Sequence, residues 1–366
     1  MRNYASADVA FGPGVSVLVG PNGQGKTNLV EALAYLSTLS SHRVATDAPL
    51  IREGADQAVI RAEVERADRS VVMEVEINQG RANRARINKS PVPKLRDILG
   101  ILRTVVFAPE DLALVKGDPA ERRRYLDDLL AQRQPRMAGV RADYERVLKQ
   151  RNALLKSSGA VRGSDRSEMD RTLQVWDEQL AEQGSQIMSA RAELISRLTS
   201  PAADAYSMLL GGGEGVKIEY APSVSLDPGE SPDAAAFRDA ILAAVAARRR
   251  EELDRGLTLV GPHRDEMSVV LLGRPVRGYA SQGESWSAAL ALRLAAFDLL
   301  EEEGGAPLLI LDDVFAELDA RRRERLVERV MHAPQALVTA AVADDVPDAL
   351  SPAWFDVVEG TVTQRA

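Results

Sequence analysis

The residues from Gly20 to Thr27 read Gly-Pro-Asn-Gly-Gln-Gly-Lys-Thr and fit the phosphate-binding pattern G-x4-G-K-[ST]. Glycines allow the backbone to wrap closely around phosphate oxygens, so that successive N–H groups point inward. A hydrophobic stretch at 15–19 precedes the loop and a helical pattern at 28–39 follows it, which is the context that the pattern requires. We therefore predict a nucleoside triphosphate site, in which the Lys26 amine reaches the β- and γ-phosphates and the Thr27 hydroxyl binds Mg²⁺. The expected ATP-binding residues are Gly20, Pro21, Asn22, Gly23, Gln24, Gly25, Lys26, Thr27 and Asn28.

A second group of residues suited to this chemistry is an acidic pair. The apolar stretch 308–311 runs directly into Asp312 and Asp313. A buried strand has little use for adjacent acids unless its carboxyl end opens into a site, although a solvated strand end would explain either acid alone. Asp312 is the expected Mg²⁺ ligand, as in P-loop enzymes generally. Asp313, on the opposite side of the strand, is expected to orient or deprotonate the attacking water, which makes it catalytic together with Lys26.

A third group is Ser281, Gln282, Gly283 and Glu284, followed by an Ala- and Leu-rich helical stretch at 288–300. A hydroxyl and backbone N–H groups at the start of a helix form a second phosphate-binding geometry. A single phosphate loop does not need a second phosphate-binding segment so far along the chain. The obvious role for this segment is to close over ATP that is bound by another subunit. On its own, the same tetrapeptide also fits an ordinary helix cap.

The order of strand and helix patterns predicts how these residues are positioned. The first 116 residues are β-rich: 71–77 alternates like a half-buried strand, and after a turn at 78–80 a second strand carries Arg84 and Arg86 on one face. Residues 117–256 contain three long charged helical patterns. The first ends at about 157, the second runs from about 167 to 199, and the third from 232 to 255. Turn-forming residues separate them at 157–163, 211–213 and 227–229.

Strand patterns return at 257–260, 267–272, 308–311 and 336–339. We therefore predict an α/β nucleotide-binding head in two parts, 1–116 and 257–366, interrupted by an antiparallel helical lobe at 117–256.

Composition excludes several classes of protein. The chain has 366 residues, of which 45% are hydrophobic and 27% charged, as in ordinary globular proteins. It contains no cysteine, so a disulfide scaffold, a cysteine-ligated zinc site and a thiol nucleophile are all excluded. Neither an apolar run of about 20 residues nor a signal-peptide pattern is present, so we expect a cytoplasmic protein without a membrane segment.

The net charge of −8 argues against a general nucleic-acid coat but leaves room for local basic patches. Residues 81–103 carry seven Lys or Arg and one acid, and residues 116–156 carry eleven Lys or Arg and six acids. Each stretch also fits a solvated face. As DNA contacts we consider Arg84 and Arg86 and, at a helix start, Arg122 and Arg123. Ion pairs of 122–124 with the acids at 127 and 128 are the alternative. Since aromatic residues make up only 4% of the chain, DNA contact should be mainly to phosphates.

Taken together, the motifs resemble the ABC-type ATPases of the chromosome-maintenance branch and, within it, the RecF family. The resemblance covers essentially the whole chain. It implies an ABC-type P-loop ATPase head, a mixed sheet with flanking helices and a β-rich subdomain, with an inserted α-helical lobe. The motifs that carry it are the phosphate loop, Ser281–Glu284, Leu311–Asp313, Ala316–Asp319, Phe107–Leu112, Gly117–Pro119, Arg122–Asp127, Gly261–Asp265 and Arg2–Tyr4.

The resemblance also implies a mechanism and partners. ATP would join two chains head to tail, with Lys26 of one subunit and Ser281 of the other around each nucleotide, Asp319 in a D-loop at the interface, and Arg2 and Asn3 beside adenine. ATP binding would close this homodimer on DNA, and weak, DNA-stimulated hydrolysis would release it. RecF proteins bind single-stranded and gapped or junction DNA and act with RecR and RecO to load RecA, in replication, recombinational repair and the SOS response.

Some residues depart from the family pattern. RecF chains usually carry a strand before Arg2-Asn-Tyr, where this sequence has Met1. If that strand is absent from the protein, the first sheet loses an edge strand and the contacts beside the adenine pocket change. Residues 109–111 stand where transporter ATPases have a glutamine. Asp313 stands where many ABC enzymes have the longer glutamate, which agrees with the slow turnover that the family resemblance implies. His263 and Arg264 are expected near the nucleotide core, with a structural histidine as the default interpretation.

Three other functions fit the sequence less well. A transporter ATPase subunit usually has a helical insertion shorter than the 140 residues from 117 to 256. That insertion is far too short for a long-armed chromosome clamp, and the Cys-x-x-Cys hook of such clamps is missing. A binding module that has lost its ATPase is disfavoured, because Lys26, Thr27, Asp312 and Asp313 are all intact.

Overall fold

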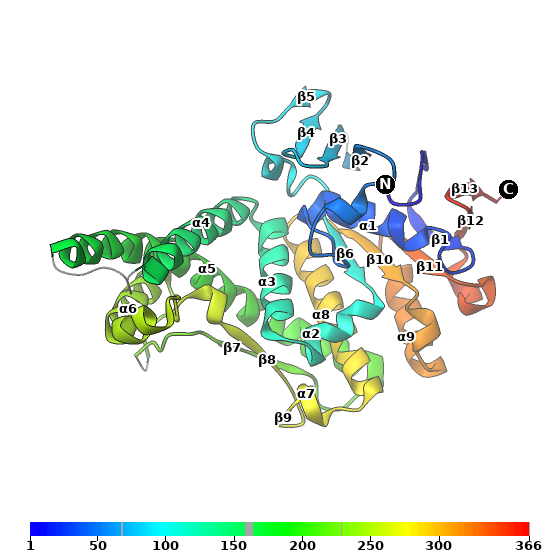
Figure 1. The fold of residues 1–366 in the computed structure, drawn as a ribbon. Helices are drawn as coiled ribbons and strands as arrows, with labels where there is room; N and C mark the ends of the chain where they lie inside the picture. Colours follow the sequence, from blue (N-terminus) through cyan, green and yellow to red (C-terminus); the bar gives the residue numbers. More distant parts are fainter. Residues whose placement is uncertain (67–68, 158–163, 228, 366) are drawn as a thin grey trace. The chain divides into compact units, whose positions relative to one another are not determined.

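The computed structural model describes residues 1–66, 69–157, 164–227 and 229–365 (Figure 1). The chain forms two compact units, of which unit 1 comprises Met1–Gly117, Ser200–Lys217 and Leu271–Ala366, and unit 2 comprises Asp118–Thr199 and Ile218–Val270. The first boundary lies one residue from the expected one. The second differs, because residues 200–217 cluster with unit 1 and residues 257–270 with unit 2.

Unit 1 is built on a six-stranded sheet with the strand order β13-β12-β1-β11-β10-β6. Every neighbouring pair is parallel except β12 and β13, so the sheet is mixed and the predicted α/β class is confirmed. Its apolar strands read as nearly continuous hydrophobic runs, as in parallel sheets covered on both faces. The strands are β1 (Gly14–Val19), β6 (Thr104–Phe107), β10 (Leu308–Asp312), β11 (Gln335–Ala340), β12 (Ala353–Val358) and β13 (Thr361–Gln364).

The helices of unit 1 include three long ones around this sheet. The helix α8 is the most deeply buried of them, with an Ala- and Leu-rich face packed in the core. Side chains of α1 and of four strands share one hydrophobic cluster that contains Leu18, Val30, Ile310, Leu337 and Phe355. The helices are α1 (Lys26–Thr38), α2 (Leu112–Lys116), α7 (Val276–Tyr279), α8 (Gln282–Glu302) and α9 (Ala320–Met331), with short turns η1 (Ala48–Leu50), η2 (Leu95–Ile98), η3 (Pro109–Asp111), η6 (Phe315–Glu317), η7 (Ala343–Asp345) and η8 (Asp348–Leu350) and the short strand β9 (Arg274–Pro275).

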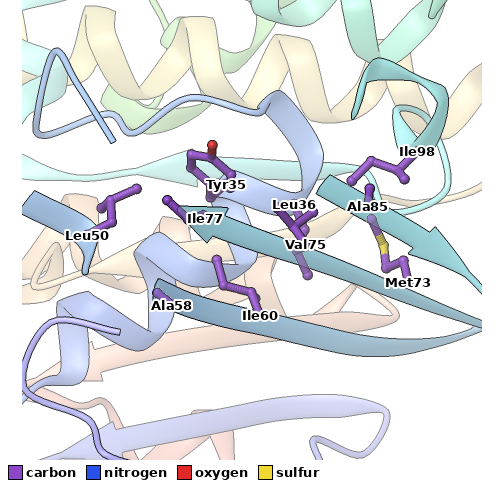
Figure 2. Close-up of a cluster of buried hydrophobic side chains, with 10 residues drawn as sticks. All are labelled: Tyr35, Leu36, Leu50, Ala58, Ile60, Met73, Val75, Ile77, Ala85 and Ile98. Atoms are coloured by element: carbon purple, nitrogen blue, oxygen red, sulfur yellow. The ribbon is translucent and has the colours of Figure 1, made fainter. Parts of the chain in front are cut away.

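A second sheet in unit 1 forms the β-rich subdomain. Its strands β2 (Gln57–Arg66), β3 (Arg69–Asn78), β4 (Arg84–Ile87) and β5 (Ser90–Pro91) pair antiparallel in sequence order. Figure 2 shows the buried face, where side chains from β2, β3 and β4 meet residues of α1. The alternation expected at 71–77 is confirmed, and Arg84 and Arg86 lie on the opposite, solvent-exposed face.

Unit 2 contains the helical lobe. The predicted helical patterns are confirmed, except that the first is two helices separated at Gln134–Pro135 and the second runs on to Leu210. Of the predicted turn regions, residues 158–163 and Pro228 lie outside the described residues. The elements are α3 (Pro119–Arg133), α4 (Arg136–Ser157), α5 (Ser164–Leu210, whose last residues cluster with unit 1), α6 (Ala234–Arg255), η5 (Pro262–Arg264), β7 (Lys217–Ala221) and β8 (Glu266–Leu271).

The strand predicted at 257–260 is wrong, since this segment has no regular structure. Its backbone is bound by side chains of the lobe instead of by a neighbouring strand. The Thr258 N–H donates to Asn152 Oδ1 at 2.7 Å, and the Leu259 N–H donates to Glu252 Oε1 at 2.8 Å. The fully buried Arg151 also donates to the Thr258 hydroxyl. These bonds explain why residues 257–270 cluster with the lobe.

His263 and Arg264 cluster with unit 2. The His263 ring bonds the Tyr144 hydroxyl through Nδ1 at 2.6 Å and the Thr258 carbonyl through Nε2 at 3.1 Å. Burial lowers the pKa of His263 to about 4, so the ring is neutral at pH 7. The Arg264 guanidinium donates to the same Thr258 carbonyl. This environment is that of a structural histidine.

Within the described part of the chain, none of the helices combines the length and the apolar character that crossing a membrane requires.

Candidate nucleotide-binding site

The phosphate loop joins β1 to α1, and glycines are required at several of its positions. Gly23 and Gly25 have φ values of 83° and 118°, which side chains rarely adopt. A Cβ on Gly20 would lie 2.2 Å from the backbone carbonyl oxygen of Val357 on β12. Gly25 is the N-cap of α1, so the loop leads directly into the helix N-terminus, where partial positive charge favours phosphate.

Two distant parts of the chain hold this loop through Gln24. The Gln24 carbonyl accepts a hydrogen bond from Asn3 Nδ2 at 3.1 Å and another from the Gly360 N–H at 3.2 Å. Its side-chain Oε1 accepts from the Glu359 N–H at 2.6 Å. The N-terminal residues and the turn between β12 and β13 therefore fix the loop from both ends of the chain.

Lys26 is buried within the loop, with only 4% of its surface exposed. Its ammonium donates to the carbonyls of Gly20, at 2.6 Å, and Pro21, at 3.3 Å. A buried ammonium needs such partners, because removing it from water without them is costly. The positive charge expected to meet the β- and γ-phosphates is thus held inside the loop that would enclose them.

The expected metal ligands Thr27 and Asp312 are brought together. The Thr27 hydroxyl donates to Asp312 Oδ1 at 3.3 Å, although the two residues are 285 positions apart. Asp312 is 2% exposed, and this burial raises its pKa to about 6. A hydroxyl and a carboxylate are oxygen ligands of the kind that Mg²⁺ prefers, and a cation would favour the ionised carboxylate that burial disfavours.

Asp313 follows in an unusual backbone conformation, with a φ of 52° in the left-handed region. Aspartate is among the few residues that tolerate this region. Its N–H donates to the hydroxyl of Thr339 on β11 at 3.0 Å. Sequence reasoning missed Thr339, because a threonine at the end of an apolar strand belongs to no motif. The one signal was its place at the end of the stretch 336–339, beside the acids expected at the same sheet edge.

The residues expected beside adenine line an open pocket of about 770 Å³. Asn3 Oδ1 accepts a hydrogen bond from Asn28 Nδ2 at 2.5 Å. The Arg2 guanidinium lies 2.6 Å from the buried Glu31 carboxylate, which orients it. Arg43 and Arg52, which no motif had indicated, lie in the loop region after α1 and also face this pocket. Its lining residues are Arg2, Asn3, Asn28, Arg43, Pro49, Ile51, Arg52 and Glu53.

Ser281 is the N-cap of α8. Its hydroxyl accepts from the Glu284 N–H at 3.3 Å, and the Glu284 carboxylate accepts from the Ser281 N–H at 2.7 Å. This hydrogen bonding with Ser281 lowers the pKa of Glu284. The helix-cap interpretation therefore describes the bonds within the chain. Ser281 and Gln282 remain exposed, as a residue that contacts a second subunit requires.

Arg322 connects this tetrapeptide with the expected D-loop. Asp319 is the N-cap of α9, accepts from the Arg322 N–H at 3.0 Å and pairs with its guanidinium at 3.4 Å. The same guanidinium covers Gly283, where a Cβ would lie 2.7 Å from its Nη1 atom. The two segments expected at a subunit interface are thus adjacent on one chain.

The expected DNA contacts differ in their availability. Arg84 is exposed on β4. Arg86 pairs with Glu74 at 2.6 Å, and Arg61 pairs with the same carboxylate at 2.5 Å. Two arginines share the Glu74 carboxylate on this face, and Glu76 lies opposite Arg84 in register, so basic and acidic side chains are mixed there.

The prediction that Arg122 contacts DNA is wrong. It is 5% exposed and binds Glu266 through two hydrogen bonds of 2.6 and 2.7 Å, so it is not available to a DNA phosphate. Arg123 is partly buried and donates to the Asp265 carbonyl at 2.8 Å. The alternative of internal ion pairs therefore describes this helix start, but Glu266 is the partner of Arg122 in place of the acids expected at 127 and 128.

Comparisons with known proteins agree with this geometry. The family model "RecF/RecN/SMC N terminal domain" matches residues 1–357. The DNA replication and repair protein RecF of Streptomyces avermitilis is 57% identical, over 99% of this chain and 96% of that protein. A solved structure of the recombination mediator protein RecF with ATP, in the RecFOR pathway, is 29% identical with a TM-score of 0.89, covering 100% of this chain and 95% of that one. An SMC head bound to the C-winged helix domain of ScpA shares the fold, with 16% identity, a TM-score of 0.53 and coverage of 100% and 94%.

The close approach of Gly20 to β12 gives a testable prediction. In Gly20→Ala the new Cβ would collide with the Val357 backbone, so the loop must shift, at a cost of roughly 1–3 kcal/mol. We expect weaker ATP binding by calorimetry and a lower free energy of unfolding in urea. Gly12→Ala is the matched control, because a Cβ there meets no atom within 4 Å. Equal ATP affinity in the two variants would contradict the proposed role of the loop geometry.

Proposed function

This chain belongs to the RecF family of DNA replication and repair proteins, and from that premise we propose that it is a DNA-binding ATPase whose two subunits close around ATP. Binding would clamp DNA near single-strand gaps, and slow hydrolysis would release it. With RecO and RecR, the closed form would assist the loading of RecA in recombinational repair, replication and the SOS response. Such a protein would work in the cytoplasm, with the chromosome.

The observation that carries the proposal is the meeting of the phosphate loop with the acid at the end of β10. The bond from Thr27 to Asp312 places a hydroxyl and a carboxylate beside the loop that encloses Lys26. These residues suit ATP with Mg²⁺, since the ion takes few protein ligands and completes its shell with phosphate and water. When bound, Mg²⁺ would neutralise phosphate charge. Among the described residues, no cluster of three or more acids or histidines competes for a metal.

The chain's own residues divide the remaining work. The loop N–H groups and the Lys26 ammonium would hold the triphosphate, which places it for reaction and stabilises developing charge. Asp313, the next residue after Asp312, would orient the attacking water and accept its proton. Its side chain is one methylene shorter than that of glutamate, which fits a slow ATPase.

The exposed N-terminus of α8 supports a site completed by a second subunit. Ser281 and Gly283 present a hydroxyl and N–H groups at a helix start, which suits the γ-phosphate of ATP held by the partner. Asp319 lies beside them through Arg322, which fits a D-loop at the same interface. A ligand shared by two subunits stabilises only the dimer, so ATP would control assembly.

For the DNA surface we propose the exposed face of the β-rich subdomain. Arg84 is exposed there, and Arg86 and Arg61 share one carboxylate, that of Glu74. Contacts from such arginines go to phosphates, which carry no sequence information. DNA stimulation of ATP hydrolysis would follow from DNA binding to the closed dimer in preference to the free subunits.

Mixing two defective variants tests the shared site. Lys26→Ala removes the phosphate-binding amine, and Ser281→Asp keeps a good helix cap while placing a carboxylate against the partner's phosphate. Each variant alone should hydrolyse little ATP. An equal mixture should regain about a quarter of the wild-type rate, because half of the dimers are mixed and each of those has one intact site.

The control for this mixture is each variant combined with itself at the same total concentration. Full activity of Ser281→Asp alone would show that Ser281 only caps α8. Two inactive variants that fail to recover on mixing would contradict a site built from both subunits.

The DNA surface is tested by the dependence of affinity on salt. The logarithm of the DNA affinity should fall linearly with the logarithm of salt concentration, with little sequence preference. Arg84→Gln should weaken binding and reduce the slope by about 1, the value for one lost phosphate contact. Arg146→Gln, at an arginine that is 70% exposed on α4, is the matched control. A slope that is unchanged in Arg84→Gln would remove this residue from the surface.

A further inference from the structure

We propose that Thr339 is the positioning residue for both acids of the ATPase site, an inference that rests on the proposed function. The residue lies at the end of β11, which is inserted between the phosphate-loop strand β1 and the acid-bearing strand β10. In register it pairs with Leu18 on one side and with Asp312 on the other. It is 1% exposed, so its hydroxyl has to find its partners within the protein.

The bonds of this hydroxyl all involve the acid pair. It donates to Asp312 Oδ1 at 2.5 Å and accepts from the Asp313 N–H at 3.0 Å. A threonine hydroxyl has one proton to donate, so the more distant Asp313 Oδ1, at 3.4 Å, is a secondary contact. One buried group therefore fixes the carboxylate of the first acid and the backbone of the second.

Fixing the Asp312 carboxylate and the Asp313 backbone would orient the two acids for their roles in catalysis. The Thr27 hydroxyl and the Thr339 hydroxyl donate to the same oxygen, Oδ1 of Asp312, which fixes the carboxylate orientation and leaves Oδ2 outside these two bonds. The Asp313 backbone has a φ of 52°, in the left-handed region, which is costly in free energy for a residue other than glycine. The bond from the Asp313 N–H to Thr339 helps to hold this conformation. Partners that orient a metal-binding group in this way typically change metal affinity or activity about 10–100-fold when they are removed.

The test compares two substitutions at Thr339 with one at a similar buried threonine. Thr339→Ala removes the hydroxyl without adding a methyl group against the Asp312 oxygen, and Thr339→Ser keeps the hydroxyl. Thr104→Ala is the control, because Thr104 is a 3% exposed threonine on β6 of the same sheet and its hydroxyl bonds Ser37 Oγ at 2.6 Å. ATP affinity is measured with and without Mg²⁺, together with kcat and the melting temperature.

In Thr339→Ala we expect the ATP affinity without Mg²⁺ to stay near that of the wild type. The increase in ATP affinity on adding Mg²⁺ should fall about 10–100-fold, and kcat should fall by a similar factor. Thr339→Ser should recover both. Thr104→Ala should lower the melting temperature and leave the Mg²⁺ gain intact, which separates positioning from general stability.

Two results would overturn the assignment. An unchanged Mg²⁺ gain in Thr339→Ala, beside a loss in Asp312→Asn, overturns the role of Thr339 and leaves the proposed function standing. An Asp312→Asn variant that keeps the wild-type Mg²⁺ gain and rate overturns both, because the acid that Thr339 orients would then have no part in the reaction.

Discussion

The hydrogen bond between the Thr27 hydroxyl and the Asp312 carboxylate is the contact on which the rest of the site depends. It joins the helix that follows β1 to the end of β10, with β11 between the two strands. Because the three strands are parallel, their carboxyl ends meet at one edge of the sheet, and ligands of such sheets bind at that edge. The phosphate loop, the acid pair and Thr339 are therefore brought together by strand direction.

Several arginines of the helical unit form ion pairs inside the protein. Arg151 is fully buried between Asp177 and Glu252, and Arg191 binds Asp127 and Asp265. Removing one member of such a pair leaves a buried charge unpaired, so these arginines hold the helical unit together and cannot also serve DNA. A basic stretch in the sequence thus overstates the positive surface that the fold presents, and the exposed face of β4 is the better candidate for phosphate contacts.

The features predicted well from sequence are those fixed by neighbouring residues. The phosphate loop needs glycines at set positions between a strand and a helix, and the acid pair follows an apolar run, so both could be placed without the fold. Thr339 and the partner of Arg122 depend on pairing between segments far apart in the sequence, which no local pattern records. The strand wrongly expected at 257–260 had the right apolar character, but side chains of the lobe satisfy its backbone groups. The same bonds place this segment with unit 2.

The central claim is that ATP is held between two subunits, each contributing half of the site. Molar mass by light scattering, with and without ATP and Mg²⁺, tests it most directly when the wild type is compared with Asp313→Asn. The account predicts that ATP doubles the molar mass and that the doubled mass persists in Asp313→Asn, in which hydrolysis is impaired. A protein that binds ATP but keeps the mass of one chain under every condition would contradict the account, and Ser281 would then be a helix cap alone.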